Sequence, residues 1–142
     1  MIHNLENKKI LVLGGAGRIG KAVSISIFES GGIPLIFDID FNLLKKIYSN
    51  FKSDKLYLFK GDISNIESIK MIIKDASNIS QKIDGAVYCA YPKSNGWGNN
   101  IENLNENNLK EDLYMQLGAP ILFAKEILKY FSKNGGGNLI NL

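Results

Sequence analysis

Three residue types that build many active sites are scarce in this 142-residue sequence, which has one cysteine, one histidine and one arginine. Because Cys89 has no second cysteine to pair with, the chain cannot form a disulfide framework. One cysteine and one histidine also cannot supply the usual ligands of a zinc or iron site. A Ser-His-Asp triad would have to use His3, close to the first residue. We therefore expect neither a metal site nor hydrolytic chemistry of these kinds.

Long apolar runs are also missing. The longest stretch without a charged residue, Leu113–Ala124, has twelve positions, whereas a membrane-spanning helix needs about 20 apolar residues. The first nine residues, up to Lys9, contain no hydrophobic core of a signal peptide. We therefore expect no membrane contact and a cytoplasmic location.

Basic residues are not concentrated in any part of the chain. The 17 lysines and arginines exceed the 14 acidic residues by three and are spread along the sequence. Nucleic-acid-binding proteins usually gather their basic residues on one face. The sequence therefore predicts no nucleic acid partner.

The sequence does have the length and apolar content of one domain over residues 1–142, with 45% hydrophobic residues. Short apolar runs alternate with longer segments of helical period, which is typical of βαβ units around a parallel sheet. The expected strands are Ile10–Leu13, Ile33–Phe37, Lys55–Phe59, Ile83–Tyr88 and Asn138–Leu142. The expected fold class is α/β, a Rossmann-type doubly wound parallel sheet with strand order 3-2-1-4-5.

Helices are expected between these strands, over Arg18–Ser30, Phe41–Asn50, Ser64–Ala76 and Glu106–Ser132. Ser64 to Glu67 has the spacing of a capping box at the start of the third helix. Pro120 should bend the fourth helix, because proline removes a backbone hydrogen bond. The core side of that helix is predicted to carry Leu109, Leu113, Leu117, Ile121 and Leu128. The segment Tyr91–Asn105 contains turn-forming residues and is predicted to be a long loop.

A glycine-rich segment follows the first expected strand. Gly14 suits a tight turn, Gly17 lets the backbone approach a pyrophosphate, and Gly20 lets the following helix pack closely on the sheet. Free N–H groups and the helix dipole would then attract the phosphates. Arg18 could reach a phosphate or could face solvent. Taken alone, the glycines could equally form a turn that only reverses the chain.

Asp38 lies at the end of the second expected strand, 18 residues after Gly20. A carboxylate at this position can accept hydrogen bonds from the adenosine ribose and would repel a 2′-phosphate. No lysine or arginine occurs between Pro34 and Leu44. These features favour NAD over NADP, while the alternative for Asp38 is a helix N-cap or a solvated turn residue.

With these residues in place, the sequence resembles the short-chain dehydrogenase/reductase family from Lys9 to Leu142. The family's Thr-Gly-x-x-x-Gly-x-Gly loop matches Leu13 to Gly20, with Leu13 in place of threonine and Arg18 in place of the middle glycine. The other matching blocks are Gly61-Asp62-Ile63, Ala90 within the family's Asn-Asn-Ala-Gly segment, and Gly136 to Asn141 before and within the fifth strand. Cys89 to Pro92 is also similar to members linked to flagellin modification and surface sugars.

The resemblance implies further contacts and roles. It places Asp62 and Ile63 at the adenine and Ala90 near the nicotinamide ribose. Ile19 is a candidate contact for the pyrophosphate and ribose, together with the glycines and Asp38. Gln116 stands where the family has an asparagine that supports a proton relay. The family is commonly dimeric or tetrameric and acts on small molecules, so a homo-oligomer with a small-molecule substrate is expected.

The resemblance also implies which catalytic residues are missing. Family members use a serine after the fifth strand and a Tyr-x-x-x-Lys on the next helix, and both would lie beyond Leu142. The one such spacing here, Tyr48 to Lys52, falls on the adenosine side and is interpreted as chance. We therefore expect no catalytic residue in this chain, which would be an N-terminal cofactor-binding portion that lacks the catalytic part and is inactive alone.

Three hypotheses for function remain open from the sequence. The first is an NAD-dependent oxidoreductase that moves a hydride between nicotinamide and a hydroxyl or carbonyl group, with a substrate that could be sugar-derived. The second is a non-catalytic dinucleotide sensor or scaffold, and the third is a domain that binds nothing. In the long loop, Lys93 and Trp97 could touch an anionic group or a sugar ring, or could simply be exposed.

Overall fold

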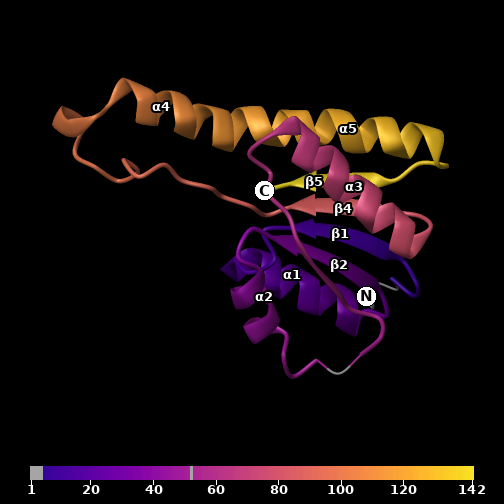
Figure 1. Ribbon diagram of the computed structural model, residues 1–142. Helices are drawn as coiled ribbons and strands as arrows, with labels where there is room; N and C mark the ends of the chain where they lie inside the picture. Colours follow the sequence, from indigo (N-terminus) through magenta and orange to yellow (C-terminus); the bar gives the residue numbers. More distant parts are fainter. Residues whose placement is uncertain (1–4, 52) are drawn as a thin grey trace.

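The computed structural model describes residues 5–51 and 53–142, so His3 and Lys52 lie outside the described residues. Its centre is a five-stranded sheet in the order β3-β2-β1-β4-β5 (Figure 1). The strands are β1 (Lys9–Leu13), β2 (Ile33–Asp38), β3 (Tyr57–Lys60), β4 (Gly85–Tyr88) and β5 (Asn138–Asn141). All four pairings are parallel. The predicted α/β fold and strand order are confirmed.

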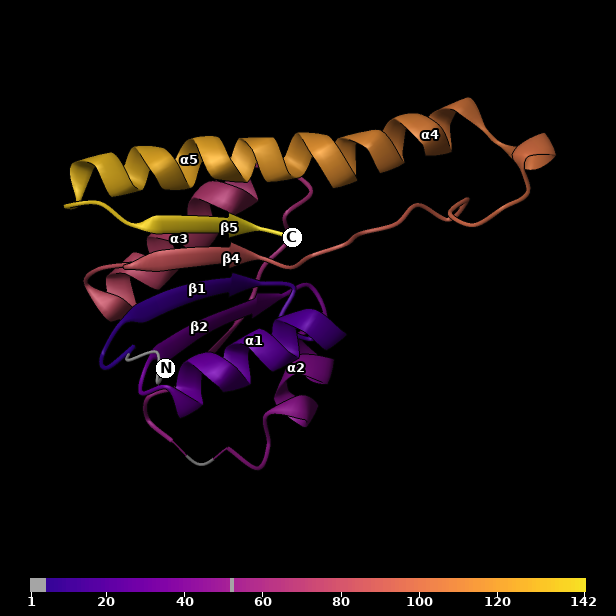
Figure 2. The same cartoon turned by 180° about the vertical axis from the view of Figure 1, so that it is seen from behind.

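Helices cover both faces of the sheet (Figures 1 and 2). On one face lie α1 (Arg18–Glu29) and α2 (Phe41–Ile47), and on the other lie α3 (Ile66–Ser80) and α5 (Ala119–Lys133). Leu11 and Leu13 pack in the cluster with α3 and α5, while Ile36 packs with α2. Burial on both faces explains why the central strands read as continuous apolar runs.

The start of α3 differs by one residue from the predicted capping box. The N-cap is Asn65, whose side chain accepts a hydrogen bond of 2.9 Å from the backbone N–H of Ser68. Ser64 belongs to the preceding turn, because its own N–H donates to Asp62 at 2.8 Å. Asparagine and serine are comparable N-caps, so sequence alone could not decide between the two positions.

The long helix predicted before the fifth strand has an irregular turn in its middle. A helix α4 (Glu106–Leu113) leads into a π-helical turn η2 (Tyr114–Gly118), and α5 then begins with Pro120 in its first turn. The three segments follow one another along one rod (Figure 2). A proline needs no donor partner at the start of a helix. The widened turn therefore replaces the single continuous helix that the sequence predicts.

The predicted core side of this rod is wrong. Its five leucine and isoleucine side chains are 41% to 61% exposed, and the face turned to the sheet carries Ala119, Phe123, Ile127 and Phe131 instead. The rod is apolar on two sides, and periodicity cannot tell which side faces inward. We call the exposed side the leucine stripe, and it comprises Leu109, Leu113, Leu117, Ile121 and Leu128.

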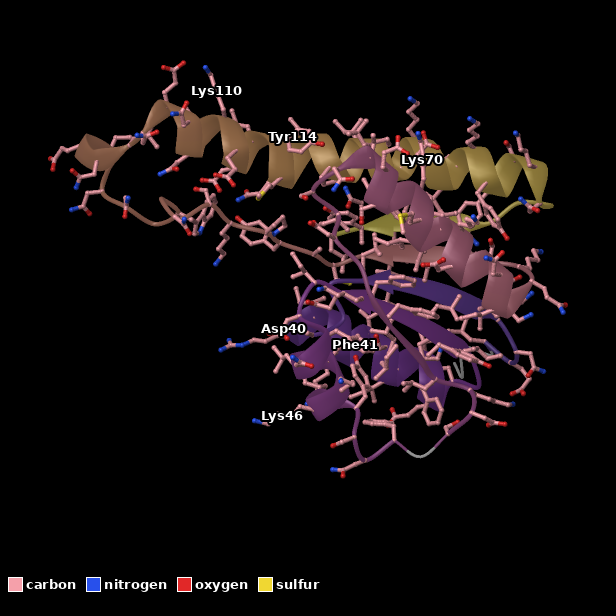
Figure 3. The ribbon with its side chains drawn as sticks, in the orientation of Figure 1. Asp40, Phe41, Lys46, Lys70, Lys110 and Tyr114 are labelled. Carbon is pink, nitrogen blue, oxygen red and sulfur yellow. The ribbon has the colours of Figure 1, made fainter. Side chains whose placement is uncertain are left out.

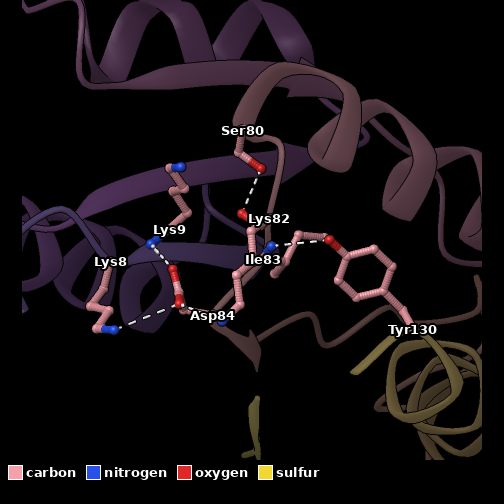
Figure 4. Close-up of polar contacts among 7 residues, drawn as sticks. All are labelled: Lys8, Lys9, Ser80, Lys82, Ile83, Asp84 and Tyr130. Atoms are coloured by element: carbon pink, nitrogen blue, oxygen red, sulfur yellow. Dashed lines mark hydrogen bonds and ion pairs between the residues drawn. The ribbon is translucent and has the colours of Figure 1, made fainter. Parts of the chain in front are cut away.

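The amino-terminal edge of the sheet is fastened by Asp84 (Figure 4). Its carboxylate accepts a hydrogen bond of 3.0 Å from the backbone N–H of Lys9 and lies 3.7 Å and 3.5 Å from the ammonium groups of Lys8 and Lys82. Beside it, the N–H of Ile83 donates to the hydroxyl of Tyr130 at 3.2 Å. These contacts join β1, β4 and α5 at the edge opposite the carboxyl ends of the strands.

Candidate functional site

A crevice of about 690 Å³ lies at the carboxyl ends of the strands. The chain leaves β1 toward β2 on one side and later returns to β4 on the other, and parallel α/β sheets bind ligands where the strand order reverses in this way. Of the predicted site residues, these line the crevice: Gly14, Gly17, Arg18, Ile19, Asp38, Asp62, Ile63 and Ala90. Gly20 does not line it.

The glycine segment forms the floor of the crevice. Gly14 has a φ of +80°, which favours glycine, and its N–H donates to the carbonyl of Phe37 at 2.9 Å. A Cβ on Gly14 would lie 2.6 Å from the Cα of Ala90, so the backbones of these two residues touch. A Cβ on Gly20 would overlap the carbonyl oxygen of Gly14. Gly20 therefore lets α1 pack on the turn, while Gly14 makes the turn itself.

The first turn of α1 faces this crevice without a side-chain cap. Gly17 is the N-cap, no side chain within residues 5–51 and 53–142 caps this turn, and no acidic residue lies in it. The N–H of Lys21 donates to the carbonyl of Gly17 at 2.9 Å. The N–H groups that precede Lys21 and the positive end of the helix dipole thus meet at one place. This arrangement suits an anion such as a phosphate.

Asp38 connects this turn to the end of β2. One carboxylate oxygen accepts a hydrogen bond of 2.9 Å from the N–H of Ala16, and the other accepts one of 3.0 Å from the N–H of Asp40. The N-cap of α2 is Asp40, labelled in Figure 3, which accepts from the N–H of Leu43 at 2.9 Å. The N-cap alternative for Asp38 is therefore wrong. Its carboxylate borders the crevice beside the glycine turn.

Tyr48 supports the same turn from below, a role that sequence reasoning missed. Its buried hydroxyl donates to the carbonyl of Gly15 at 3.1 Å, and a Cβ on Gly15 would overlap Ile36. Burial raises the pKa of Tyr48, which keeps the phenol protonated as a donor. The structure thus gives Tyr48 a place in the support of the turn, away from the crevice lining. Its predicted spacing partner Lys52 lies outside the described residues.

On the β3 side of the crevice, Asp62 and Ile63 follow the end of that strand. Asp62 accepts a hydrogen bond from the N–H of Ser64 at 2.8 Å and so forms the turn that leads into α3. The same residue also lines the crevice, and Ile63 packs partly against the core. The geometry therefore gives Asp62 a structural contact and leaves it within reach of a ligand.

The other side of the crevice begins at the end of β4. The N–H of Cys89 donates to the carbonyl of Leu13 at 2.9 Å, and burial raises the pKa of its thiol to about 11. A thiol of that pKa is neutral near pH 7 and a poor nucleophile. From the rod, Met115 and Ala119 complete this wall.

Gln116, in η2, has a buried side-chain nitrogen with no hydrogen-bond partner in the described part of the chain. The family that the sequence resembles has an asparagine at this position, and the change to glutamine does not carry that residue's role over to this chain. An amide nitrogen buried in this way can donate a hydrogen bond, so the position carries an available donor.

Neither a metal site nor a membrane-spanning helix is found among residues 5–51 and 53–142. No three histidine, cysteine, aspartate or glutamate side chains gather to hold a metal ion. No helix in these ranges combines the length and apolarity needed to cross a bilayer.

Comparison with known proteins gives a consistent family match. Residues 8–142 match the family model described as short chain dehydrogenase. The chain is 38% identical over 143 residues to the post-translational flagellin modification protein A of Campylobacter coli, covering 97% of this chain and 56% of that protein.

Two solved structures share the fold. A short-chain type dehydrogenase/reductase from Mycobacterium ulcerans gives a TM-score of 0.85 at 17% identity, over 97% of this chain and 51% of that one. A short chain dehydrogenase from Leptospira borgpetersenii, solved with bound NAD+, gives 0.82 at 20% identity, over 99% and 52%. The chain spans about half the length of each of these proteins.

Proposed function

The chain belongs to the short-chain dehydrogenase family, and we propose that it forms the dinucleotide-binding portion of an NAD-dependent oxidoreductase. The carboxylate of Asp38 carries this proposal, because it is held at the crevice edge by two backbone N–H groups. A carboxylate keeps further acceptor positions when two are used. Those positions suit the hydroxyl groups of a ribose.

The residues around the crevice fit an extended dinucleotide. The uncapped first turn of α1 and the bare backbone at Gly14 and Gly17 suit a pyrophosphate, with Arg18 and Ile19 at the mouth. In this proposal Asp62 and Ile63 contact the adenine, and Ala90 lies beside the nicotinamide ribose. Gly20 acts indirectly by letting α1 pack on the turn. NAD, when bound, supplies the hydride acceptor or donor.

The choice of NAD over NADP rests on charge. A 2′-phosphate placed beside Asp38 would meet a fixed negative charge, and the sequence from Pro34 to Leu44 provides no cation to offset it. The N–H of Ala16 fixes the carboxylate against turning away. We therefore propose a clear preference for NAD.

The reaction we propose is hydride transfer between nicotinamide and a hydroxyl or carbonyl group of a small, sugar-derived molecule. The relative from Campylobacter coli is named for flagellin modification, which supports a substrate connected with that process. The proposed chemistry also needs a proton donor at the substrate oxygen. We assign no catalytic residue to this chain and propose that the proton is transferred by residues C-terminal to Leu142, so the chain alone should be inactive.

Isothermal titration calorimetry of the 142-residue chain tests the cofactor proposal. We expect saturable binding of NAD with a dissociation constant at least tenfold lower than that of NADP. Absence of heat with both nucleotides would support a domain that binds neither. Tighter binding of NADP would contradict the role of Asp38.

A homo-oligomer is the partner we propose. The leucine stripe offers an apolar surface along α4, η2 and α5, on residues that are 41% to 61% exposed. In Figure 3 Lys110 and Tyr114 project from the same rod away from the sheet. A second copy presenting the same stripe would bury both surfaces by a two-fold contact.

A further inference from the structure

A lysine lies over two aromatic rings in the loop that follows β4. The ammonium nitrogen of Lys93 is 5.5 Å from the ring centre of Tyr91 and 5.9 Å from that of Trp97. The two rings meet edge to face, with centroids 5.6 Å apart and planes at 90°. The three side chains thus form one cluster with a single positive charge, which we call the loop cluster.

The loop cluster stands on an ordered piece of chain. The backbone N–H and the hydroxyl of Ser94 both donate to the carboxylate of Asp112 on α4, at 2.7 Å and 2.9 Å. Ser94 is buried, and its hydroxyl also accepts from the N–H of Gly96 at 3.3 Å. The N–H of Trp97 donates to the carbonyl of Ser94 at 3.2 Å. These bonds connect the loop to the rod and limit the entropy that a bound molecule would have to remove.

Two of the three residues of the loop cluster line the crevice, and Trp97 packs against one of them without lining it. Tyr91 and Lys93 line it together with Met115, on the β4 side of β1, whereas Asp38 lines it on the β2 side. A dinucleotide running from Asp38 across the glycine turn to Ala90 would leave this end for the second reactant. A ligand group bound at Lys93 would therefore belong to the substrate and not to the cofactor.

Within the described part of the chain, Lys93 forms no ion pair. Asp112, the acidic side chain that holds the loop, already accepts both bonds from Ser94. A cation at the end of a crevice, beside two aromatic surfaces, is suited to a molecule that carries both an anionic group and an apolar ring face.

We propose that Lys93, Tyr91 and Trp97 bind an anionic substituent, a carboxylate or a phosphate ester, on a sugar-type ring. The ammonium pairs with the anion, and the aromatic rings pack against the ring of the substrate. This assignment rests on the proposed function, since it names the substrate class for the same crevice. It makes Lys93 a specificity-determining residue.

Trp97 is the one tryptophan of the sequence, so its fluorescence reports on the cluster directly. The experiment titrates the 142-residue chain with glucuronate, glucose 6-phosphate and uncharged glucose at constant ionic strength. Lys93→Gln is the test variant. Lys45→Gln is the matched control, because Lys45 also lies over an aromatic ring, 5.0 Å from that of Phe41, but does not line the crevice.

We expect saturable fluorescence changes with at least one charged sugar, at least tenfold weaker binding of glucose, and a loss of at least tenfold in Lys93→Gln but not in Lys45→Gln. Tighter binding of glucuronate would identify the anion as a carboxylate, and tighter binding of glucose 6-phosphate would identify it as a phosphate ester. Lys93→Arg should retain most of the affinity.

Three outcomes would overturn the assignment: equal binding of glucose and the charged sugars, equal losses in the two glutamine variants, or no response to any of the three sugars. NAD calorimetry on the same proteins separates this inference from the proposed function. If NAD binds and the sugars do not, only the substrate assignment fails. If the sugars bind through Lys93 and NAD does not, only the cofactor proposal fails.

Discussion

Asp38 accepts hydrogen bonds from two backbone N–H groups and is also the acceptor that we propose for the ribose. Asp38→Ala removes the acceptor proposed for the ribose, and hydrogen bonds to a charged group are worth about 1.5–3 kcal/mol. We expect NAD affinity to fall about 10- to 100-fold. NADP should lose less, because the repulsion of its 2′-phosphate disappears with the carboxylate. Calorimetry with both nucleotides measures the difference.

The control for this prediction is Asp40→Ala, two residues further along. It removes the N-cap of α2 outside the crevice lining, and it should lower the free energy of unfolding by about 1 kcal/mol without changing nucleotide affinity. Equal losses of NAD and NADP affinity in Asp38→Ala would argue against a ribose contact and for a purely structural carboxylate.

Tyr88 carries a buried hydroxyl with no hydrogen-bond partner in the part of the chain that the structure describes. An unpaired buried hydroxyl is destabilising, so Tyr88→Phe should raise the free energy of unfolding by about 1 kcal/mol. The ring stays in place against Phe123. Urea denaturation at pH 7 measures the change, and a destabilised variant would show that the hydroxyl has a partner in solution.

The same tyrosine predicts a loss of stability in alkali. Burial raises the pKa of Tyr88 above the ordinary value of 10.0. Above pH 10 the Tyr88 hydroxyl therefore ionises in the unfolded chain but stays neutral in the folded chain. The free energy of unfolding then falls by at most about 1.4 kcal/mol per pH unit from this group. Below pH 10 the contribution is fully present. Tyr88→Phe should flatten the fall between pH 10 and 11, and an unchanged slope would contradict the assignment.

The sequence predicts the positions of those crevice residues that lie within a single βαβ unit. Gly14, Gly20 and Asp38 could be predicted because strand, turn and helix fix their relative places. Tyr48 and Gly15 are 33 residues apart, and Ser94 and Asp112 are 18 apart. No local pattern joins such pairs, so their contacts emerge only when the elements are packed.

Among the elements, β1 and β4 depend on one partly buried carboxylate for their amino-terminal alignment. Asp84→Ala would leave the N–H of Lys9 without its acceptor and would remove two ion pairs. We expect a loss of about 1–3 kcal/mol in the free energy of unfolding. The carboxyl-end crevice lies at the opposite edge, so nucleotide affinity should not change.

The matched control is Glu67→Ala, which removes an exposed ion pair of 2.8 Å with Lys70 in the first turns of α3. Exposed pairs contribute about 0–1 kcal/mol, so urea denaturation should separate the two variants. A loss in Glu67→Ala as large as that in Asp84→Ala would mean that burial does not distinguish these two carboxylates.

The elements themselves could be predicted, while their inward faces could be predicted only in part. The sheet strands are buried on both sides, so their apolar runs identify them and the alternation with helices gives the order. The rod is different, because Phe123 and Leu117 lie on two apolar sides of the same helical segment. The π-helical turn before Pro120 also shifts the register between α4 and α5. No spacing of residues in the sequence predicts this turn.

In the molecule as a whole, the rod is the feature for which we expect a contact with another protein surface. Its α4 end extends beyond the sheet (Figures 1 and 2), so the sheet does not cover it. Solvent-exposed apolar stripes of this extent mark interaction surfaces in many proteins. We propose a second copy of the chain as the partner, because the leucine stripes of the two copies would then cover each other.

Leu113→Lys combined with Leu117→Lys places two charges in the middle of the leucine stripe. Burying an unpaired ammonium is strongly unfavourable, so the double variant should shift the chain from dimer to monomer, with a dimer dissociation constant raised at least 100-fold. Met71→Lys is the control, because Met71 is an equally exposed apolar residue on α3, outside the stripe. Sedimentation equilibrium over a range of concentrations measures all three proteins. A wild-type chain that stays monomeric would contradict the proposed dimer, and a Met71→Lys variant that dissociates to the same extent would place the contact between copies elsewhere.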